Sequence, residues 1–174
     1  YKKGAYQGPV QQYLGDGLPL LENKIRKGEK IKMLLLGDSL SCGGSSSSNL
    51  KCEPYLKNWY ELFADAVSAA SGAEATMNNS YSVGGQISDW SLSSSGERLG
   101  NIDLNKAQAA VLKEDPDLVL IGWGMNDGTW HEKSETLAEN VLKIIDSITY
   151  VAKRKIEFLV IGTCMPNNNG ACYV

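Results

Sequence analysis

The sequence predicts an α/β fold, a three-layer α/β/α sandwich around a mainly parallel, flavodoxin-like, doubly wound sheet. Three observations support this. Short apolar runs recur along the chain, segments of helical periodicity separate them, and turn-forming residues bound both. Apolar strands that alternate with helices of this length indicate a parallel sheet covered on both faces. Right-handed crossovers then place helices on either side of the sheet.

The strands are the first set of elements to justify. The run from Ile31 to Leu36 is apolar except for Lys32, which is typical of a strand buried on both faces. A weaker strand is expected at Ala75–Asn79, with Tyr81–Gly85 turning away from it. Two further apolar runs complete the set, at Leu118–Ile121 and Ile156–Ile161.

The helices follow from apolar residues at helical spacing. Glycines end two of them, Gly28 and Gly72, as expected for a C-terminal cap. Ser134, with a glutamate behind it, is the expected N-cap of the last helix. The four expected helices are Leu18–Arg26, Asn58–Ala70, Asn105–Lys113 and Ser134–Ala152.

Composition and charge narrow the class of protein. The chain has 174 residues, 43% of them hydrophobic, which suits one domain with a substantial core. A formal net charge of −3 without a Lys/Arg block argues against nucleic acid and membrane surfaces as partners. We expect residues 1–28 to be a lead-in segment with a short helix and residues 29–174 to be the domain. The first residues from Tyr1 onward do not have the charged-then-apolar pattern of a leader, so localisation cannot be read from them.

The four cysteines leave their redox state open. Cys42, Cys52, Cys164 and Cys172 form no C-x-x-C pair, and the chain has a single histidine, so a zinc site is not expected. The local pairs 42/52 and 164/172 are compatible with disulfides that close short loops. They are equally compatible with free thiols, since four cysteines allow three pairings.

Small polar residues and glycines follow the predicted strands where their carboxyl ends share one rim. Acyl transfer needs an accessible hydroxyl and two or three N–H donors aimed at one oxyanion. Ser39 offers its Oγ and its own N–H, Gly84 a backbone N–H, and Asn126 a side-chain amide. The sequences after the strands are Gly37-Asp38-Ser39, Asn79-Ser80-Tyr81-Ser82-Val83-Gly84-Gly85, Gly122-Trp123-Gly124-Met125-Asn126-Asp127-Gly128 and Thr163-Cys164-Met165-Pro166-Asn167.

Each of these residues also has a purely structural interpretation. An isolated Ser39 is a helix cap or a loop serine, and Asn126 before Asp127-Gly128 is a turn residue. Gly84-Gly85 fits both a plain turn and an oxyanion site. The three features together favour the functional interpretation, because they occur in order after successive strands.

Taken together, these motifs resemble the SGNH, or GDSL, hydrolases. Gly37-Asp38-Ser39-Leu40, the glycine after the second strand and Gly124-Met125-Asn126-Asp127 match the family's first three motif blocks. The resemblance runs from about Lys30 to the end of the chain. Residues 37–48 and 158–167 are most similar to the carbohydrate-esterase and acetylesterase branches.

The resemblance implies a role for each residue. Ser39 is the nucleophile, and the Ser39 and Gly84 amides with the Asn126 side chain form the oxyanion hole. Gly85 is the alternative glycine, and Asp38 orders the nucleophile turn. The family's D-x-x-H block is missing from the sequence. We therefore expect a truncated domain that lacks the C-terminal strand and helix, with its catalytic histidine beyond Val174.

The expected function is a serine esterase that deacetylates a carbohydrate through a Ser39 acyl-enzyme, without metal or organic cofactor. The lone histidine, His131, is a candidate pocket residue or substitute base, and Trp123, Trp130 and Trp90 are candidate sugar contacts. Two alternatives remain, a non-catalytic glycan-binding member of the fold and a flavodoxin-like module that binds a phosphate or flavin. The resemblance slightly favours an extracellular or cell-surface location. The oligomeric state cannot be predicted.

Overall fold

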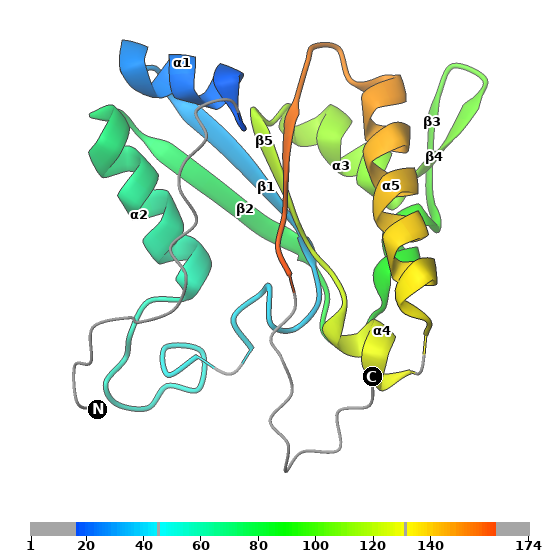
Figure 1. The fold of residues 1–174 in the computed structure, drawn as a ribbon, viewed down its shortest axis with the longest axis horizontal. Coiled ribbons are helices and arrows are strands. Elements are labelled where there is room, and N and C mark those ends of the chain that lie inside the picture. Colours follow the sequence, from blue (N-terminus) through cyan, green and yellow to red (C-terminus); the bar gives the residue numbers. More distant parts are fainter. Residues whose placement is uncertain (1–16, 45, 131, 163–174) are drawn as a thin grey trace.

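A parallel four-stranded sheet runs through the described part of the protein in the computed structural model, which covers residues 17–44, 46–130 and 132–162 (Figure 1). Its strand order is β2-β1-β5-β6, and each neighbouring pair is parallel. The predicted α/β class is therefore confirmed. The strands are β1 (Ile31–Gly37), β2 (Ala75–Ser82), β5 (Leu118–Gly122) and β6 (Glu157–Val160).

Helices cover both faces of this sheet, which accounts for the continuous apolar runs of β1 and β5. On one face, Leu34 and Leu36 pack with α3 (Lys106–Glu114) and α5 (Ser134–Val151). On the other, Leu35 packs with residues of α1 (Pro19–Lys27) and α2 (Trp59–Ser71). Figure 1 shows the sheet between these two pairs of helices, as the predicted three-layer sandwich requires.

The helix ends follow local signals in the sequence. Asn58 begins α2 through a capping box with Glu61, and Asn105 does the same for α3 with Gln108. Gly28 and Gly72 end α1 and α2 in the left-handed conformation, as predicted. The prediction for Ser134 was wrong by one residue. Lys133 holds the N-cap position of α5, without a side-chain hydrogen bond, and Ser134 is already helical.

The segment between β2 and α3 contains elements that the sequence pattern does not reveal. A 3-10 helix η1 (Ser88–Leu92) precedes an antiparallel hairpin of β3 (Ser94–Leu99) and β4 (Ile102–Asn105). Most side chains of β3 are exposed, so no apolar alternation marks it. The second strand is also longer than predicted, because Tyr81 and Ser82 still pair with β1 rather than turning away.

Some predictions differ from the structure, and others concern residues that lie outside its described part. Cys42 and Cys52 are free thiols, so the local 42/52 disulfide is not formed. His131, Cys164 and Cys172 lie outside the described residues, as does most of the predicted lead-in. Among the described helices, none has both the length and the apolar character needed to cross a membrane.

Candidate active site

Three strand ends bring the predicted catalytic residues to one edge of the sheet. Ser39 follows β1 by two residues, and Gly84 follows β2 by the same interval. Asn126 lies in the first turn of α4 (Met125–Thr129), a short helix directly after β5 that the sequence pattern did not predict. Ser39 and Asn126 are half-buried and Gly84 is exposed, so the edge is accessible.

Gly84 is the glycine that lies against the serine. A Cβ atom built on Gly84 would stand 3.6 Å from Ser39 Cβ, and the Val83 N–H donates to Gly37 O at 2.7 Å. Gly85 instead has a φ of 77° and open space around its Cβ position. The geometry therefore favours Gly84 over Gly85 as the neighbour of the serine, and Gly85 as the residue that allows the turn.

Asp38 connects the serine turn to α4. Its carboxylate accepts the Leu40 N–H at 2.9 Å and the Met125 N–H at 3.2 Å, so residues adjacent to Ser39 and Asn126 share one acceptor. The side chain is 1% exposed. Burial raises the pKa of the Asp38 carboxyl above its ordinary value, although the amide donors oppose the shift. Its position supports the expected ordering role rather than direct contact with substrate.

The serine turn packs closely against the ends of β1 and β5. Ser41 Oγ donates to Gly122 O at 2.8 Å, and Gly44 N–H donates to Ser39 O at 2.8 Å. Gly37 has no room for a side chain, because its Cβ would lie 2.8 Å from Gly122 O and would overlap Ser41. The turn is thus held by the tight packing at Gly37 before Ser39 and by the hydrogen bonds of Ser41 and Gly44 after it.

The side-chain amide of Asn126 is tied to the loop after β2. Its Nδ2 donates to Gln86 O at 2.9 Å, which uses one of its two hydrogens. The amide therefore has a fixed orientation and a second hydrogen for another acceptor. The next residue, Asp127, is 2% exposed and accepts hydrogen bonds from the N–H and the Oγ of Ser88.

The tryptophans behave differently from one another, and the prediction for Trp123 was wrong. Trp123 is 3% exposed, its indole N–H donates to Ser91 Oγ at 3.1 Å, and its ring packs near Trp90. Its burial in the core leaves no face for a substrate. Trp130 is 64% exposed and stays a candidate sugar contact.

A mainly apolar cavity of about 290 Å³ adjoins the serine turn on the side of α2 and β6. Leu40, Trp59 and Ile161 contribute to its lining, and the Trp59 indole N–H donates to Leu40 O at 3.0 Å. Trp59 was not among the predicted site residues, because its helical spacing indicated a core position. Its capacity to contact a ligand follows from the position of α2 beside the serine turn.

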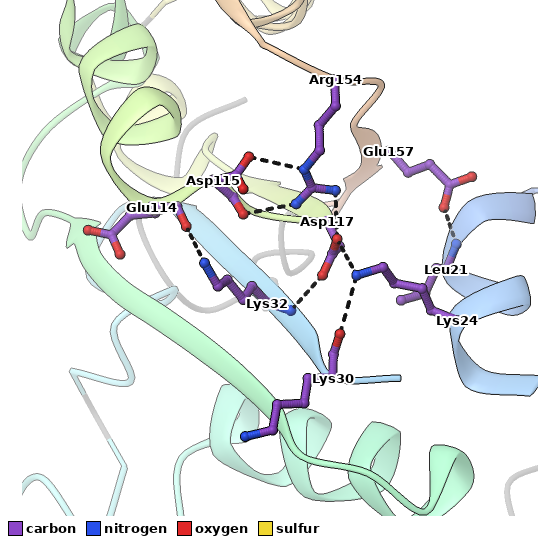
Figure 2. Close-up of polar contacts among 9 residues, drawn as sticks. All are labelled: Leu21, Lys24, Lys30, Lys32, Glu114, Asp115, Asp117, Arg154 and Glu157. Carbon is purple, nitrogen blue, oxygen red and sulfur yellow. Dashed lines mark hydrogen bonds and ion pairs between the residues drawn. The ribbon is translucent and has the colours of Figure 1, made fainter. Parts of the chain in front are cut away.

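A second polar cluster occupies the opposite edge of the sheet (Figure 2). Asp117 lies at its centre, and its Oδ1 is 2.8 Å from Lys24 Nζ and 2.7 Å from Arg154 Nη1. Its other oxygen, Oδ2, accepts the Lys32 N–H. Burial alone favours the protonated acid, but Lys24, the Lys32 amide and Arg154 hold the pKa of Asp117 below its ordinary value. Because Asp117 binds both Lys24 of α1 and the Lys32 amide of β1, the cluster joins α1 to the sheet.

Glu157 extends this join to the last described strand. Its carboxylate accepts the N–H groups of Leu20 at 2.7 Å and Leu21 at 2.8 Å, in the first turn of α1 (Figure 2 draws the Leu21 bond). Neither Asp117 nor Glu157 was singled out from the sequence. In the part of the chain that the structure describes, no group of three or more His, Cys, Asp or Glu side chains could hold a metal ion.

Comparison with known families agrees with the fold and the motifs. Residues 35–172 match the model of the GDSL-like lipase/acylhydrolase family. The chain therefore belongs to this family of hydrolases, and the resemblance drawn from the motifs is confirmed. A search of curated proteins finds no match.

Several solved structures share the fold. TesA is 22% identical with a TM-score of 0.56, over 80% of this chain and 64% of TesA. A two-domain esterase (CEX) active on acetylated mannans is 21% identical with a TM-score of 0.56, over 82% of this chain and 33% of the esterase. The Clostridium thermocellum family 3 carbohydrate esterase is 16% identical with a TM-score of 0.53, over 75% and 61% respectively. The chain thus spans less than two thirds of each of these proteins.

Proposed function

We propose that this protein is a serine esterase in which Ser39 is the nucleophile and Ser39, Gly84 and Asn126 form the oxyanion hole. One observation carries the proposal. Gly84 lies beside Ser39, and Asp38 joins the serine turn to the start of the helix that carries Asn126. These contacts connect three loops that are distant in sequence, and they support the proposed site.

The chemistry requires a nucleophile and donors at the same carbonyl. Ser39 Oγ attacks the ester carbon while its proton passes to a base, and the carbonyl oxygen becomes an oxyanion. The Ser39 and Gly84 amides and the Asn126 side chain donate to that oxygen. Collapse of the intermediate breaks the ester bond, and the alcohol leaves with the proton from the base. Water then hydrolyses the acyl-serine and restores the hydroxyl.

The proposal assigns the base to a histidine that the described residues do not include. The lone histidine of the sequence, His131, is outside them, and the sequence has no D-x-x-H block. A serine hydroxyl without a neighbouring base is a weak nucleophile. Activity assays therefore belong on the full-length protein.

The proposed substrate is an acetylated carbohydrate. Two structural neighbours support this, the esterase active on acetylated mannans and the family 3 carbohydrate esterase. The exposed Trp130 ring adds a surface on which a sugar can stack. The family match favours this hydrolytic function over the flavodoxin-like binding module.

The test compares full-length Ser39→Ala with the wild type on p-nitrophenyl acetate and on acetylated mannan oligosaccharides, with acetate release as the readout. We expect Ser39→Ala to lose turnover and labelling by a fluorophosphonate, while Ser80→Ala, at an exposed position on β2, keeps both. Turnover retained in Ser39→Ala would refute the nucleophile assignment. Sugar binding without turnover in the wild type would instead identify a non-catalytic, glycan-binding member of the family.

A further inference from the structure

We infer that buried Ser88 and Asp127, together with half-buried Asn140, form a positioning network that sets the side-chain amide of Asn126 relative to the Gly84 amide. The inference rests on the proposed function, because it concerns the geometry of the same oxyanion hole. The hydrogen bonds of these side chains join the three residues to one another rather than to Ser39. They act through the loop and the helix that carry the two donors.

The network begins with a buried carboxylate. Asp127 is 2% exposed, and its oxygens accept the Ser88 N–H at 3.0 and 3.2 Å as well as the Ser88 hydroxyl. Ser88 is fully buried, and its Oγ also lies 2.9 Å from Asn140 Nδ2. A carboxylate in this setting is costly to bury unless it has donors, so these contacts fix its position.

The direction of each hydrogen bond follows from the chemistry of the groups. The Ser88 hydroxyl donates to Asp127 Oδ1, as a hydroxyl can toward a carboxyl oxygen. The Ser88 oxygen is then free to accept from the Asn140 amide, which has hydrogens to give. The chain of bonds therefore runs from α5 through η1 to α4, with each hydrogen bond joining a donor to an acceptor.

Two adjacent residues of α4, Asn126 and Asp127, thus bind two positions in the segment after β2. Asn126 Nδ2 binds Gln86 O, and Asp127 binds Ser88 two residues further on. The same loop begins with Gly84, whose Cβ position is 3.6 Å from Ser39 Cβ. A shift of α4 against this loop would change the separation of the two donors, and a displacement of about 1 Å can lower a rate about a hundredfold.

Asn140 anchors the network to the rigid part of the fold. It lies in α5, one turn before Ile144, which is fully buried in the core against the sheet. The network therefore fixes the positions of the oxyanion donors relative to the core rather than relative to the surface loops. Ser88 lies in a segment for which the sequence pattern predicted no element, so only the structure reveals its role.

Ser88→Ala in the full-length protein tests the inference, with Ser91→Ala as a matched control. Ser91 lies in the same 3-10 helix, is equally buried and uses its hydroxyl to accept from Trp123 rather than to bind Asp127. We expect Ser88→Ala to lower kcat about tenfold to a hundredfold with KM nearly unchanged. Ser91→Ala should keep kcat within about twofold. An equal loss in both variants would overturn the inference, since it would reflect general loosening of η1.

A double-mutant cycle with Asn126→Ala separates positioning from an independent effect. If Ser88 acts through Asn126, the Ser88→Ala/Asn126→Ala enzyme loses no more kcat than Asn126→Ala alone. Multiplicative losses would contradict the inference. Asp127→Asn provides a second variant that keeps the shape and an acceptor oxygen at this site, and we expect it to retain more kcat than Asp127→Ala.

A readout without turnover distinguishes this inference from the proposed function. If Ser39→Ala remained active, the nucleophile assignment would fail, but the network could still be tested by NMR of the Asn126 side-chain amide. Ser88→Ala should move that resonance and speed its hydrogen exchange, and Ser91→Ala should not. An Asn126 resonance unchanged by Ser88→Ala would refute the positioning network whatever the reaction.

Discussion

Substitution of Gly37 by alanine tests how closely the serine turn is packed. The added Cβ would overlap the Ser41 hydroxyl and would lie 2.5 Å from Ser41 Cβ and 2.8 Å from Gly122 O. Ser41 would have to give up its hydrogen bond to Gly122 O, and β1 would have to move from β5. Overpacking typically costs about 1–3 kcal/mol and a lost buried hydrogen bond about 1–2 kcal/mol. We therefore expect Gly37→Ala to lower the free energy of unfolding by about 3 kcal/mol.

Urea denaturation followed by tryptophan fluorescence measures this change. With a slope near 2 kcal/mol/M, the midpoint should fall by about 1.5 M. Gly84→Ala is the matched control, since its Cβ would make only an ordinary 3.6 Å contact with Ser39 Cβ. In a Ser41→Gly background, which removes the first two overlaps, Gly37→Ala should cost less than in the wild type. A midpoint within about 0.3 M of the wild type would refute the packing argument.

Two further predictions concern ionisable groups. Asp117→Ala should lower the free energy of unfolding by about 2 kcal/mol at neutral pH, because it removes the charge-assisted hydrogen bonds of Asp117 with the partly exposed Lys24 and Arg154. As the folded pKa of Asp117 is depressed, its stabilisation is present above pH 3.8 and is lost as pH falls through the folded pKa, so the difference between variant and wild type should shrink in acid. Burial, together with the hydrogen bond to Glu114, raises the pKa of Tyr81 to about 12. Ultraviolet titration should show one tyrosine ionising near pH 12, and Tyr81→Phe should remove this transition. The absence of any tyrosine transition above about pH 10 would contradict the prediction. The stabilisation contributed by Tyr81 is present below pH 10 and is lost as pH rises through about 12.

The sequence was sufficient to predict the parts of the fold that local pattern determines. The apolar runs of β1 and β5 could be recognised because helices bury both of their faces. Once those strands were located, the positions of Ser39 and Asn126 at one sheet edge followed from parallel topology. The capping boxes of α2 and α3 and the glycine stops of α1 and α2 are likewise local in the sequence.

The remaining features depend on contacts between distant residues. Ser88 meets Asp127 across 39 positions, and Asp117 meets Lys32 across 85, so no local pattern announces either pair. The β3–β4 hairpin is largely exposed and lacks apolar alternation. Trp123 was named a candidate sugar contact because it follows a strand at the rim, although tryptophans in such loops more often cover a core edge. Its burial in the core and its bond to Ser91 depend on residues distant in the sequence.

The carboxylate of Glu157 has a consequence for the order in which the chain becomes structured during synthesis. The first turn of α1 depends on an acceptor that is 136 and 137 positions further along the chain. The ribosome makes α1 before any other described element, yet the carboxylate that accepts these two N–H groups becomes available only once β6 has emerged. The earliest helix to be made is therefore among the last to be fixed, and docking of α1 reports that the sheet has been completed as far as β6.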